Sequence, residues 1–177
     1  MLFRSRREVA QHIGDLESGA ALEALISMTK DADDGVRANA VEGLHHFDKE
    51  QRAIAPMIAA LKDKNAHVRQ HAADGLGNMN DILKTAPSAL IDALTDTDRD
   101  VRRQAANSLG NIGDEAAVPA LKKLTADPDV ETRRHAVEAL KEIGGAEAIQ
   151  ALMGLLKDND PEVRKTAAEA LGKRRGG

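Results

Sequence analysis

The stretch Asp98-Arg-Asp-Val101-Arg102-Arg-Gln-Ala-Ala-Asn-Ser-Leu109-Gly-Asn-Ile-Gly-Asp114 decides the fold of this chain. It combines a capping residue, a Val-Arg pair, two small apolar residues, a leucine and a glycine stop. Near-copies give five arginines at successive intervals of 32, 33, 31 and 31 residues. A period of this length is typical of stacked-repeat solenoids. The capping residues are Asp33, Asn65, Asp98, Asp129 and Asp160, and the ladder arginines are Arg37, Arg69, Arg102, Arg133 and Arg164.

Each repeat is predicted to form two short helices. The carboxylate of Asp98 can accept a hydrogen bond from a free amide at a helix start, and the apolar residues after it recur at helical spacing. Gly113-Asp114 predicts a helix stop, and Pro119 falls early in a second helix. One such pair cannot bury its apolar sides alone, whereas stacked pairs can. The sequence therefore predicts an all-α, right-handed α-solenoid of about five helical hairpins.

We expect the whole chain, residues 1–177, to form a single solenoid. The first helix is expected near residues 2–13, with Arg6 and Arg7 where other repeats carry alanine. Repeats at the end of a solenoid commonly turn a polar side to solvent. The predicted units are 2–32 (a degenerate cap), 33–64, 65–97, 98–128, 129–159 and 160–173 (a half-repeat cap), followed by a tail at 174–177.

Two inter-helix turns depart from the regular pattern. They look longer than the others and lie between Leu44 and Pro56, and between Met79 and Leu90. Pro87 falls within the second of these turns and is expected in the first turn of its helix, where a missing amide hydrogen does no harm.

The final helix, expected at 161–173, has no hairpin after it. Its apolar residues Val163, Ala167 and Leu171 therefore lack a following layer. This leaves the chain as a monomer or as an end-to-end dimer.

Bulk composition excludes several classes of function. Hydrophobic residues make up 42% of the chain, but aromatic residues only 1%, and the net charge is −4. An acidic chain without aromatic platforms is unlike a nucleic-acid binder. There is no cysteine, which removes disulfides, thiolate metal sites and cysteine nucleophiles. No apolar run reaches the length of a membrane span, and no apolar signal segment follows the basic amino terminus. We expect a cytoplasmic protein.

The pattern resembles the HEAT-like repeats named after the phycobilisome lyases. The likeness is carried by Val-Arg-x-x-Ala-Ala-x-x-Leu-Gly-x-Ile-Gly-Asp, complete from Val101 to Asp114, and it covers residues 2–173. The family includes chromophore lyases, a metal-dependent hydroxylase and binding scaffolds, so the resemblance implies the fold and leaves the function open. It also implies that the helix bearing Val-Arg lines the concave side, with its variable positions facing a groove.

The five ladder arginines have two interpretations. One makes them an anion-binding stripe. We favour a structural role, in which each guanidinium bonds acidic or carbonyl groups at the adjacent inter-repeat turn, such as Asp98 or Asp129. Bidentate arginine is suited to joining neighbouring layers.

The variable positions form a cationic row, a mixed polar row and an acidic row along the predicted groove. Such a surface suits a charged segment of another protein better than DNA. The alternative is that these side chains are only solvated and pair with one another. The candidate partner-binding residues are His67, Gln70, His71, Asp74, Arg103, Gln104, Asn107, Arg134, His135 and Glu138.

Catalysis finds little support in the sequence. His67, His71 and Asp74 share one helical face and could in principle hold a transition metal. The His-Glu dipeptides on which the hydroxylase branch of the family relies are absent, and His45 and His46 are expected to have a surface role near a helix end. No phosphate loop or nucleophile elbow occurs.

We therefore predict a protein–protein interaction scaffold or adaptor without intrinsic catalysis and without a cofactor, whose partner is another protein or a peptide. The alternative is a lyase-like or metal-assisted enzyme of hydroxylase type, or its accessory subunit. A chromophore lyase would need an aromatic-lined cavity, which this composition does not provide.

Overall fold

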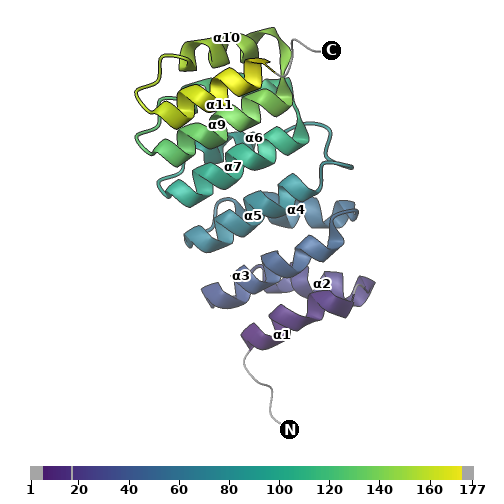
Figure 1. The fold of residues 1–177 in the computed structure, drawn as a ribbon. Helices are drawn as coiled ribbons and strands as arrows, with labels where there is room; N and C mark the ends of the chain where they lie inside the picture. Colours follow the sequence, from purple (N-terminus) through teal and green to yellow (C-terminus); the bar gives the residue numbers. More distant parts are fainter. Residues whose placement is uncertain (1–5, 17, 173–177) are drawn as a thin grey trace. The chain divides into compact units, whose positions relative to one another are not determined.

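The structure is a computed structural model, and it describes residues 6–16 and 18–172. Over these residues the chain forms helices and turns and no β-strand, which confirms the predicted all-α repeat fold (Figure 1). The chain divides into two compact units, Met1–Ile82 and Leu83–Gly177. The boundary falls inside the predicted repeat 65–97, at the long turn expected after Met79. Each unit is a stack of helical hairpins in its own right.

The first unit has two rows of helices. In one row the first helices of successive hairpins lie side by side, α1 against α3 and α3 against α5. In the other row α2 lies beside α4. The elements are α1 (Arg6–Ile13), the 3-10 turn η1 (Gly14–Leu16), α2 (Gly19–Met28), α3 (Asp34–Gly43), η2 (Leu44–Phe47), α4 (Gln51–Ala60) and α5 (Ala66–Asn78).

The second unit repeats this arrangement. The first helices α7, α9 and α11 are neighbours in that order, and α8 lies between the α6 region and α10. The elements are α6 (Ser88–Asp92), η3 (Ala93–Thr95), α7 (Arg99–Ile112), η4 (Glu115–Ala117), α8 (Val118–Leu124), α9 (Val130–Ile143), α10 (Gly145–Leu155) and α11 (Pro161–Gly172).

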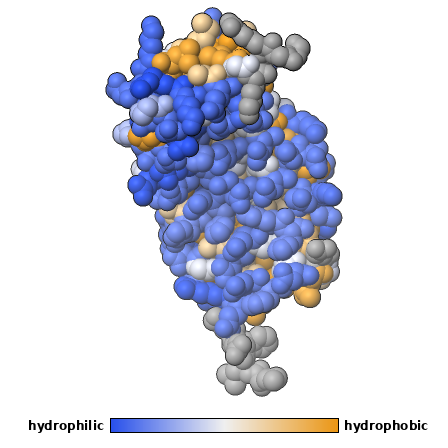
Figure 2. Space-filling view, in the orientation of Figure 1, coloured by the Kyte–Doolittle hydropathy of each residue, from blue (hydrophilic) through white to orange (hydrophobic). Residues whose placement is uncertain are grey.

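The core between the two rows is aliphatic, as the near absence of aromatic residues requires. The leucines of the repeated pattern are fully buried, and polar side chains dominate the face shown in Figure 2. Burying a leucine stabilises a fold by about 1.5–3 kcal/mol. The largest fully buried side chains include Leu22, Leu25, Leu44, Met57, Leu76, Leu90, Leu109, Leu121 and Leu140.

The predicted helix cap, helix stop and proline position are confirmed in the second unit. The carboxylate of Asp98 accepts hydrogen bonds from the amides of Asp100 and Val101, which caps α7. Gly113 ends the same helix with a φ of 74°, a left-handed conformation that favours glycine. Pro119 lies in the first turn of α8.

Two details of the turns differ from expectation. Helix α4 begins at Gln51, so Pro56 lies inside the helix and not at the end of the turn. The connection between α3 and α4, residues 44–50 with η2, is nevertheless longer than the one between α7 and α8, residues 113–117. Residues 79–87 do form a long connection between α5 and α6, and Pro87 occupies the position just before α6.

The final helix also corrects a prediction. Val163 and Ala167 of α11 are completely buried, because α11 packs against α9 and α10. These two residues are therefore covered by the preceding hairpin and are not available for an end-to-end contact, whereas the third residue of that expectation, Leu171, is half-buried. Residues 2–5 of the expected first helix, and residues 173–177 at the other end, lie outside the described residues.

Candidate functional site

The ladder arginine Arg102 joins the two ends of its hairpin. Its Nη1 donates to the carbonyl oxygens of Asp96 at 2.9 Å and Thr97 at 3.3 Å, in the turn before α7. Its Nε and Nη2 donate to the two carboxylate oxygens of Asp127 at 2.8 and 3.1 Å, in the turn after α8. Both side chains are nearly buried, with exposed fractions of 14% and 8%.

Arg37 and Arg133 make the same arrangement in their own hairpins. Arg37 binds the carboxylate of Asp63 at 2.7 and 2.9 Å, and Arg133 binds that of Asp158 at 3.1 and 3.2 Å. The carboxylates that receive these ladder arginines stand two residues before a capping residue. The sequence analysis had named the capping residues Asp98 and Asp129 as examples of partners for the ladder arginines. The structure shows that the partners are these other aspartates.

Each of these turn aspartates has a second role. An oxygen of its carboxylate accepts the backbone N–H of the capping residue two positions later, at 2.8–2.9 Å. An aspartate at this position in every repeat was a readable signal that our sequence analysis missed. The pairs are Asp31 with Asp33, Asp63 with Asn65, Asp96 with Asp98, Asp127 with Asp129, and Asp158 with Asp160.

Arg6 belongs to the same ladder. It contacts the carboxylate of Asp31 at 3.0 Å, with the same separation along the chain as Arg102 and Asp127. The expectation that Arg6 and Arg7 replace alanines was therefore wrong, because the register of the first helix is different. Arg7 instead binds the capping residue Asp33 at 2.7 and 2.8 Å. This contact lowers the pKa of the Asp33 carboxyl.

The two other ladder arginines bind carbonyl groups. Arg69 donates from Nη1 to the carbonyl oxygen of Asp63 at 2.8 Å. Arg164 donates from Nη1 to the carbonyl oxygens of Asp158 at 2.6 Å and Asn159 at 2.9 Å. The ladder residues thus bind other groups of their own chain, and this favours the structural interpretation over an anion-binding stripe.

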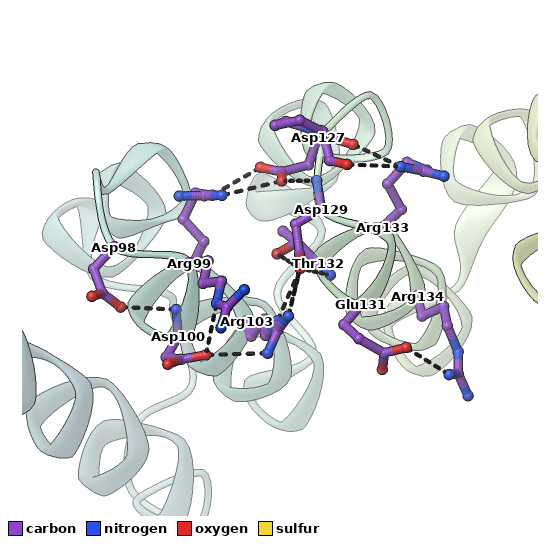
Figure 3. A network of polar contacts seen from close by, with 12 residues as sticks. Asp98, Arg99, Asp100, Arg103, Asp127, Asp129, Glu131, Thr132, Arg133 and Arg134 are labelled. Carbon is purple, nitrogen blue, oxygen red and sulfur yellow. Dashed lines mark hydrogen bonds and ion pairs between the residues drawn. The ribbon is translucent and has the colours of Figure 1, made fainter. Parts of the chain in front are cut away.

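In the second unit, the candidate residue Arg103 is bound to the start of the next first helix (Figure 3). It makes bidentate contacts of 2.8–3.0 Å with the capping residue Asp129 and a further contact of 3.1 Å with Asp100. Asp129 also accepts the amide and the hydroxyl of Thr132, both at 2.7 Å. Partial burial acts to raise the pKa of Asp129, but the hydrogen bonds from Thr132 and Arg103 outweigh it and lower the pKa to about 2.

Other candidates on α9 are more exposed. Arg134 pairs with Glu131 of its own helix at 2.9 Å, and their side chains are 41% and 49% exposed (Figure 3). Glu138 pairs with Lys141, again within α9. These pairs occupy the outer side of the helix.

The polar row of the second unit connects α7 to α9. Nδ1 of His135 donates to Oδ1 of Asn107 at 2.7 Å, and Gln104 lies 3.5 Å from the hydroxyl of Ser108. Burial is the main cause that lowers the pKa of His135, and the nearby Arg103 adds to it. The neutral imidazole is therefore the favoured form at neutral pH.

In the first unit, two of the candidates on α5 contact a histidine from η2, the turn that follows α3. His67 is exposed, whereas Gln70, His71 and Asp74 are half-buried. Nε2 of His45 donates to the carbonyl oxygen of His71 at 2.9 Å, and its Nδ1 lies 3.7 Å from the carboxylate of Asp74. Burial is the largest cause that lowers the pKa of His71.

His45 was expected to be an ordinary surface residue, and the structure corrects this. Its ring extends from η2 onto α5 and lies against Gly75. A Cβ atom at Gly75 would lie 2.7 Å from Cδ2 of His45, so glycine is what makes room for the ring. The sequence signal was the small residue seven positions after the valine of the repeat.

In the part of the chain that the structure describes, no three His, Asp or Glu side chains come together as a metal site would require, although His67, His71 and Asp74 share a helix face. Within residues 6–16 and 18–172, none of the helices combines the length and the apolar character that crossing a bilayer needs.

Stacked hairpins joined by repeated arginine–aspartate contacts define a class, the α-helical repeat proteins. The model of one family in this class, HEAT repeats, matches residues 22–89, 54–133 and 122–176. Together these matches span most of the sequence, and the chain belongs to the HEAT repeat family. The repeats are of the type found in phycobilisome lyases. None of the curated proteins matches the chain.

The chain is also similar in structure to solved proteins of this repeat class. A chain from the complex of CpcE and CpcF of phycocyanin lyase from Nostoc sp. PCC7120 is 29% identical, with a TM-score of 0.70. The match covers 85% of this chain and 63% of that one. A designed armadillo repeat protein in complex with the peptide (KR)4 is 22% identical, with a TM-score of 0.69 and coverage of 94% and 89%. An engineered protein is 24% identical, with a TM-score of 0.66 and coverage of 97% and 91%.

Proposed function

We propose that this protein is a scaffold that binds a segment of another protein along the exposed side of its first helices. Each unit offers such a surface, on α3 and α5 in the first and on α7 and α9 in the second. Concave faces of repeat proteins are common binding surfaces. The proposed contact residues are His67, Gln70, His71 and Asp74 in the first unit, and Arg103, Gln104, Asn107, Arg134, His135 and Glu138 in the second.

The observation that carries the proposal is the contrast between two neighbouring arginines on α9. Arg133 is bound to the turn aspartate Asp158 and is nearly buried. Arg134 is 41% exposed and pairs with Glu131, one turn earlier on the same helix. An exposed pair of this kind contributes only about 0.2–0.5 kcal/mol to a helix. Arg134 can therefore exchange Glu131 for a partner's carboxylate at little cost to the fold.

Charge defines the kind of partner. The outer side of α9 alternates in sign, with Glu131, Arg134, Glu138 and Lys141 in sequence. Alternating charges fit a protein segment that carries both signs. A nucleic acid would meet acidic groups beside each cation, and the whole chain has a net charge of −4.

The comparisons support a binding role in general terms. The similar phycocyanin lyase chain is part of a complex of two proteins, CpcE and CpcF. The designed armadillo protein, which shares only the fold, holds a peptide. Both are properties of those proteins, and here they support the proposal that stacked hairpins of this kind can hold a protein segment.

The test is to measure how well variants of the exposed residues of α9 capture binding partners. Arg103 is not a suitable target, because reversing its charge would also disrupt the cap of α9 at Asp129. We therefore choose Arg134→Glu combined with Glu138→Lys. The matched control is Lys122→Glu on the exposed side of α8.

We expect the double variant to retain at least tenfold less of the captured protein, at an unchanged melting temperature. The control should capture as the unaltered protein does. Undiminished capture by the folded double variant would contradict the proposal.

The second candidate is a lyase-like accessory subunit, which the 29% identity to a phycocyanin lyase chain favours. An absorption spectrum of the purified protein after incubation with a chromophore tests it. A red-shifted, protein-bound band would support this candidate, and an unchanged spectrum of the free chromophore would contradict it.

A further inference from the structure

The three first helices of the second unit carry the same pair of opposite charges at the same place. In each helix, an acidic residue two positions after the capping residue pairs with a basic residue three positions further on. The charged atoms lie 3.1, 2.9 and 3.6 Å apart. Helix α3 of the first unit lacks this pair, because the equivalent residues are Gly35 and Ala38. The pairs are Asp100 with Arg103 and Glu131 with Arg134, both shown in Figure 3, and Glu162 with Lys165.

These pairs form two parallel rows across the second unit, because α9 packs against both α7 and α11. One row contains the acids Asp100, Glu131 and Glu162, and the other contains the bases Arg103, Arg134 and Lys165. We call them the Glu131 row and the Arg134 row. The pKa of Arg103 is raised, chiefly by its hydrogen bonds with Asp129, and the carboxylate of Glu131 on the neighbouring helix adds to this. Since packed helices lie about 8–10 Å apart, the charge in each row repeats at about this interval.

Most members of the two rows can change partners. Arg134 and Lys165 are 41% and 63% exposed, and within the described part of the chain each pairs with only the acid of its own helix. Exposed pairs are weak, so a carboxylate from another molecule can replace that acid at little cost to the fold. Arg103 differs, because the capping residue Asp129 already binds it. The positions open to a partner are therefore two bases of the Arg134 row and the half-exposed acids of the Glu131 row.

The interval between the pairs selects the conformation of a segment that crosses the three helices. In a polyproline II segment, residues three apart lie on the same side and about 9.3 Å from one another. Same-side residues of a β-strand are only about 6.6 Å apart. One and two turns of an α-helix rise about 5.4 and 10.8 Å. Of these periods, only that of polyproline II falls within the interval of about 8–10 Å.

We propose that the two rows bind a polyproline II segment of another protein, in which an acidic and a basic residue each recur at every third position. This inference rests on the proposed function and names the class of its partner. The three residues of each turn point in three directions, so one set faces each row. The acids of the segment bind Arg134 and Lys165, and its bases bind the Glu131 row. The third set faces solvent, and proline there fixes the conformation without adding charge.

A second copy of this chain does not supply such a segment. Three of its five prolines, Pro56, Pro119 and Pro161, lie within helices. No stretch of the sequence repeats an acid, a base and a proline at intervals of three residues. The charge pattern of the two rows is thus matched by a partner of different composition.

Two peptides of identical composition test the period. The first is fluorescein-labelled (Pro-Glu-Lys)4, in which acids and bases recur at every third residue. The second carries the same label on (Glu-Lys)4 followed by four prolines, which gives a period of two. Their charges are equal, so attraction that depends only on net charge is the same for both. Circular dichroism checks that the first peptide is in polyproline II conformation, and fluorescence anisotropy measures the affinity of each for the protein.

The protein variants separate the Arg134 row from charge in general. Arg134→Gln combined with Lys165→Gln removes the two exchangeable bases. The matched control is Lys122→Gln combined with Lys123→Gln, which removes the same charge from exposed positions of α8. The melting temperature checks that both variants remain folded.

We expect the unaltered protein and the α8 control to bind the period-three peptide at least fivefold more tightly than the period-two peptide. The variant of Arg134 and Lys165 should show no such preference. Equal affinity of the two peptides for the unaltered protein, tighter binding of the period-two peptide, or a preference that survives in the folded variant of Arg134 and Lys165 would overturn the inference. Loss of partner capture by Arg134→Glu with Glu138→Lys, together with equal peptide affinities, would reject the polyproline II partner and leave the proposed function standing.

Discussion

Two pairs of neighbouring first helices, α3–α5 and α7–α9, bind the capping residue of their second member in different ways. In α7–α9, Arg103 reaches across to the capping residue Asp129 of the next helix. In α3–α5 the equivalent position is Ala38, and the next cap is Asn65, whose amide donates to Asp34 at 2.8 Å. In α7–α9, the arginine of the earlier helix binds an acidic capping residue. In α3–α5, that position is an alanine, and the neutral capping residue Asn65 binds an aspartate of the earlier helix instead.

The closest approach of the helices differs as well. In α7–α9, Gly110 faces the backbone of Ala139, and a Cβ atom at Gly110 would lie 3.0 Å from its Cα. In α3–α5 the glycine is on the other helix, where Gly75 accommodates the ring of His45. The ladder arginines set the common period, and the contacts beside them vary from one pair of helices to the next. A variable row next to a constant one is what a binding scaffold requires.

Among the changes that test this comparison of helix pairs, the largest effect is expected from Gly75→Ala. The new methyl group would lie 2.7 Å from Cδ2 of His45 and 2.9 Å from Cε of Met57. Overpacking of this kind costs about 2 kcal/mol. Urea unfolding measures the loss, and His45→Ala in the same chain should recover part of it. The control is Gly154→Ala, which meets no atom within 4 Å. Equal stability of the two glycine variants would contradict the account of α3–α5.

A smaller loss is expected from Arg103→Gln. Hydrogen bonds to a charged group contribute about 1.5–3 kcal/mol. The lower end of this range applies here, because Arg103 and Asp129 are partly exposed to solvent. The control is Arg99→Gln, an exposed arginine of the same helix, which should change the unfolding free energy by less than about 0.5 kcal/mol. Similar losses in both variants would show that Arg103 does not hold the cap.

Thr132→Val tests the hydroxyl group that also donates to the capping residue Asp129. Four other repeats carry valine at this position, so the variant fits the fold but loses the hydroxyl bond to Asp129, worth about 1 kcal/mol. The pKa of Asp129, about 2 in the folded protein, should rise. A lowered carboxyl pKa stabilises the fold above the unfolded value of about 4, and this contribution is lost as the pH falls toward 2. Carbon NMR of the carboxyl measures the shift, and an unchanged pKa would contradict the assignment.

The smallest effect is expected from the two half-buried histidines. The pKa values of His71 and His135 are lowered, chiefly by burial. A lowered histidine pKa stabilises the fold above the unfolded value of about 6.5, and this contribution is lost as the pH falls through the folded pKa. His71→Gln and His135→Gln should each flatten the fall in melting temperature just below pH 6.5. An identical pH profile in the unaltered protein and both variants would contradict this.

The sequence was sufficient for the period, the caps and the helix stops. Asp98 and Gly113 act within a few residues of their own position, and such local signals can be read without knowledge of the packing. The aspartate two residues before each cap was equally local and could have been found by aligning the repeats. The arginine that also binds this aspartate, such as Arg102 for Asp127, could not be found in this way, because it comes from another helix and depends on how the hairpin packs.

The candidate site was less predictable, because neighbouring residues divide their roles through geometry. Arg102 and Arg103 are adjacent in sequence, and Asp127 and Asp129 are two residues apart. Either arginine could have paired with either aspartate. Only the direction of each side chain from α7 assigns Arg102 to Asp127 and Arg103 to Asp129. The place of His45 likewise depends on Gly75, which lies on another helix.

The central claim is that the ladder row holds the fold while exposed residues of the adjacent row, such as Arg134, can exchange their partners, and one comparison on α9 tests it directly. Arg133 and Arg134 are consecutive, with exposed fractions of 14% and 41%. The measurement is the unfolding free energy of Arg133→Gln and Arg134→Gln in urea. Removing one partner of a buried pair costs about 3 kcal/mol, whereas an exposed pair contributes less than about 1 kcal/mol. We predict a large loss for Arg133→Gln and almost none for Arg134→Gln, and equal losses would contradict the claim.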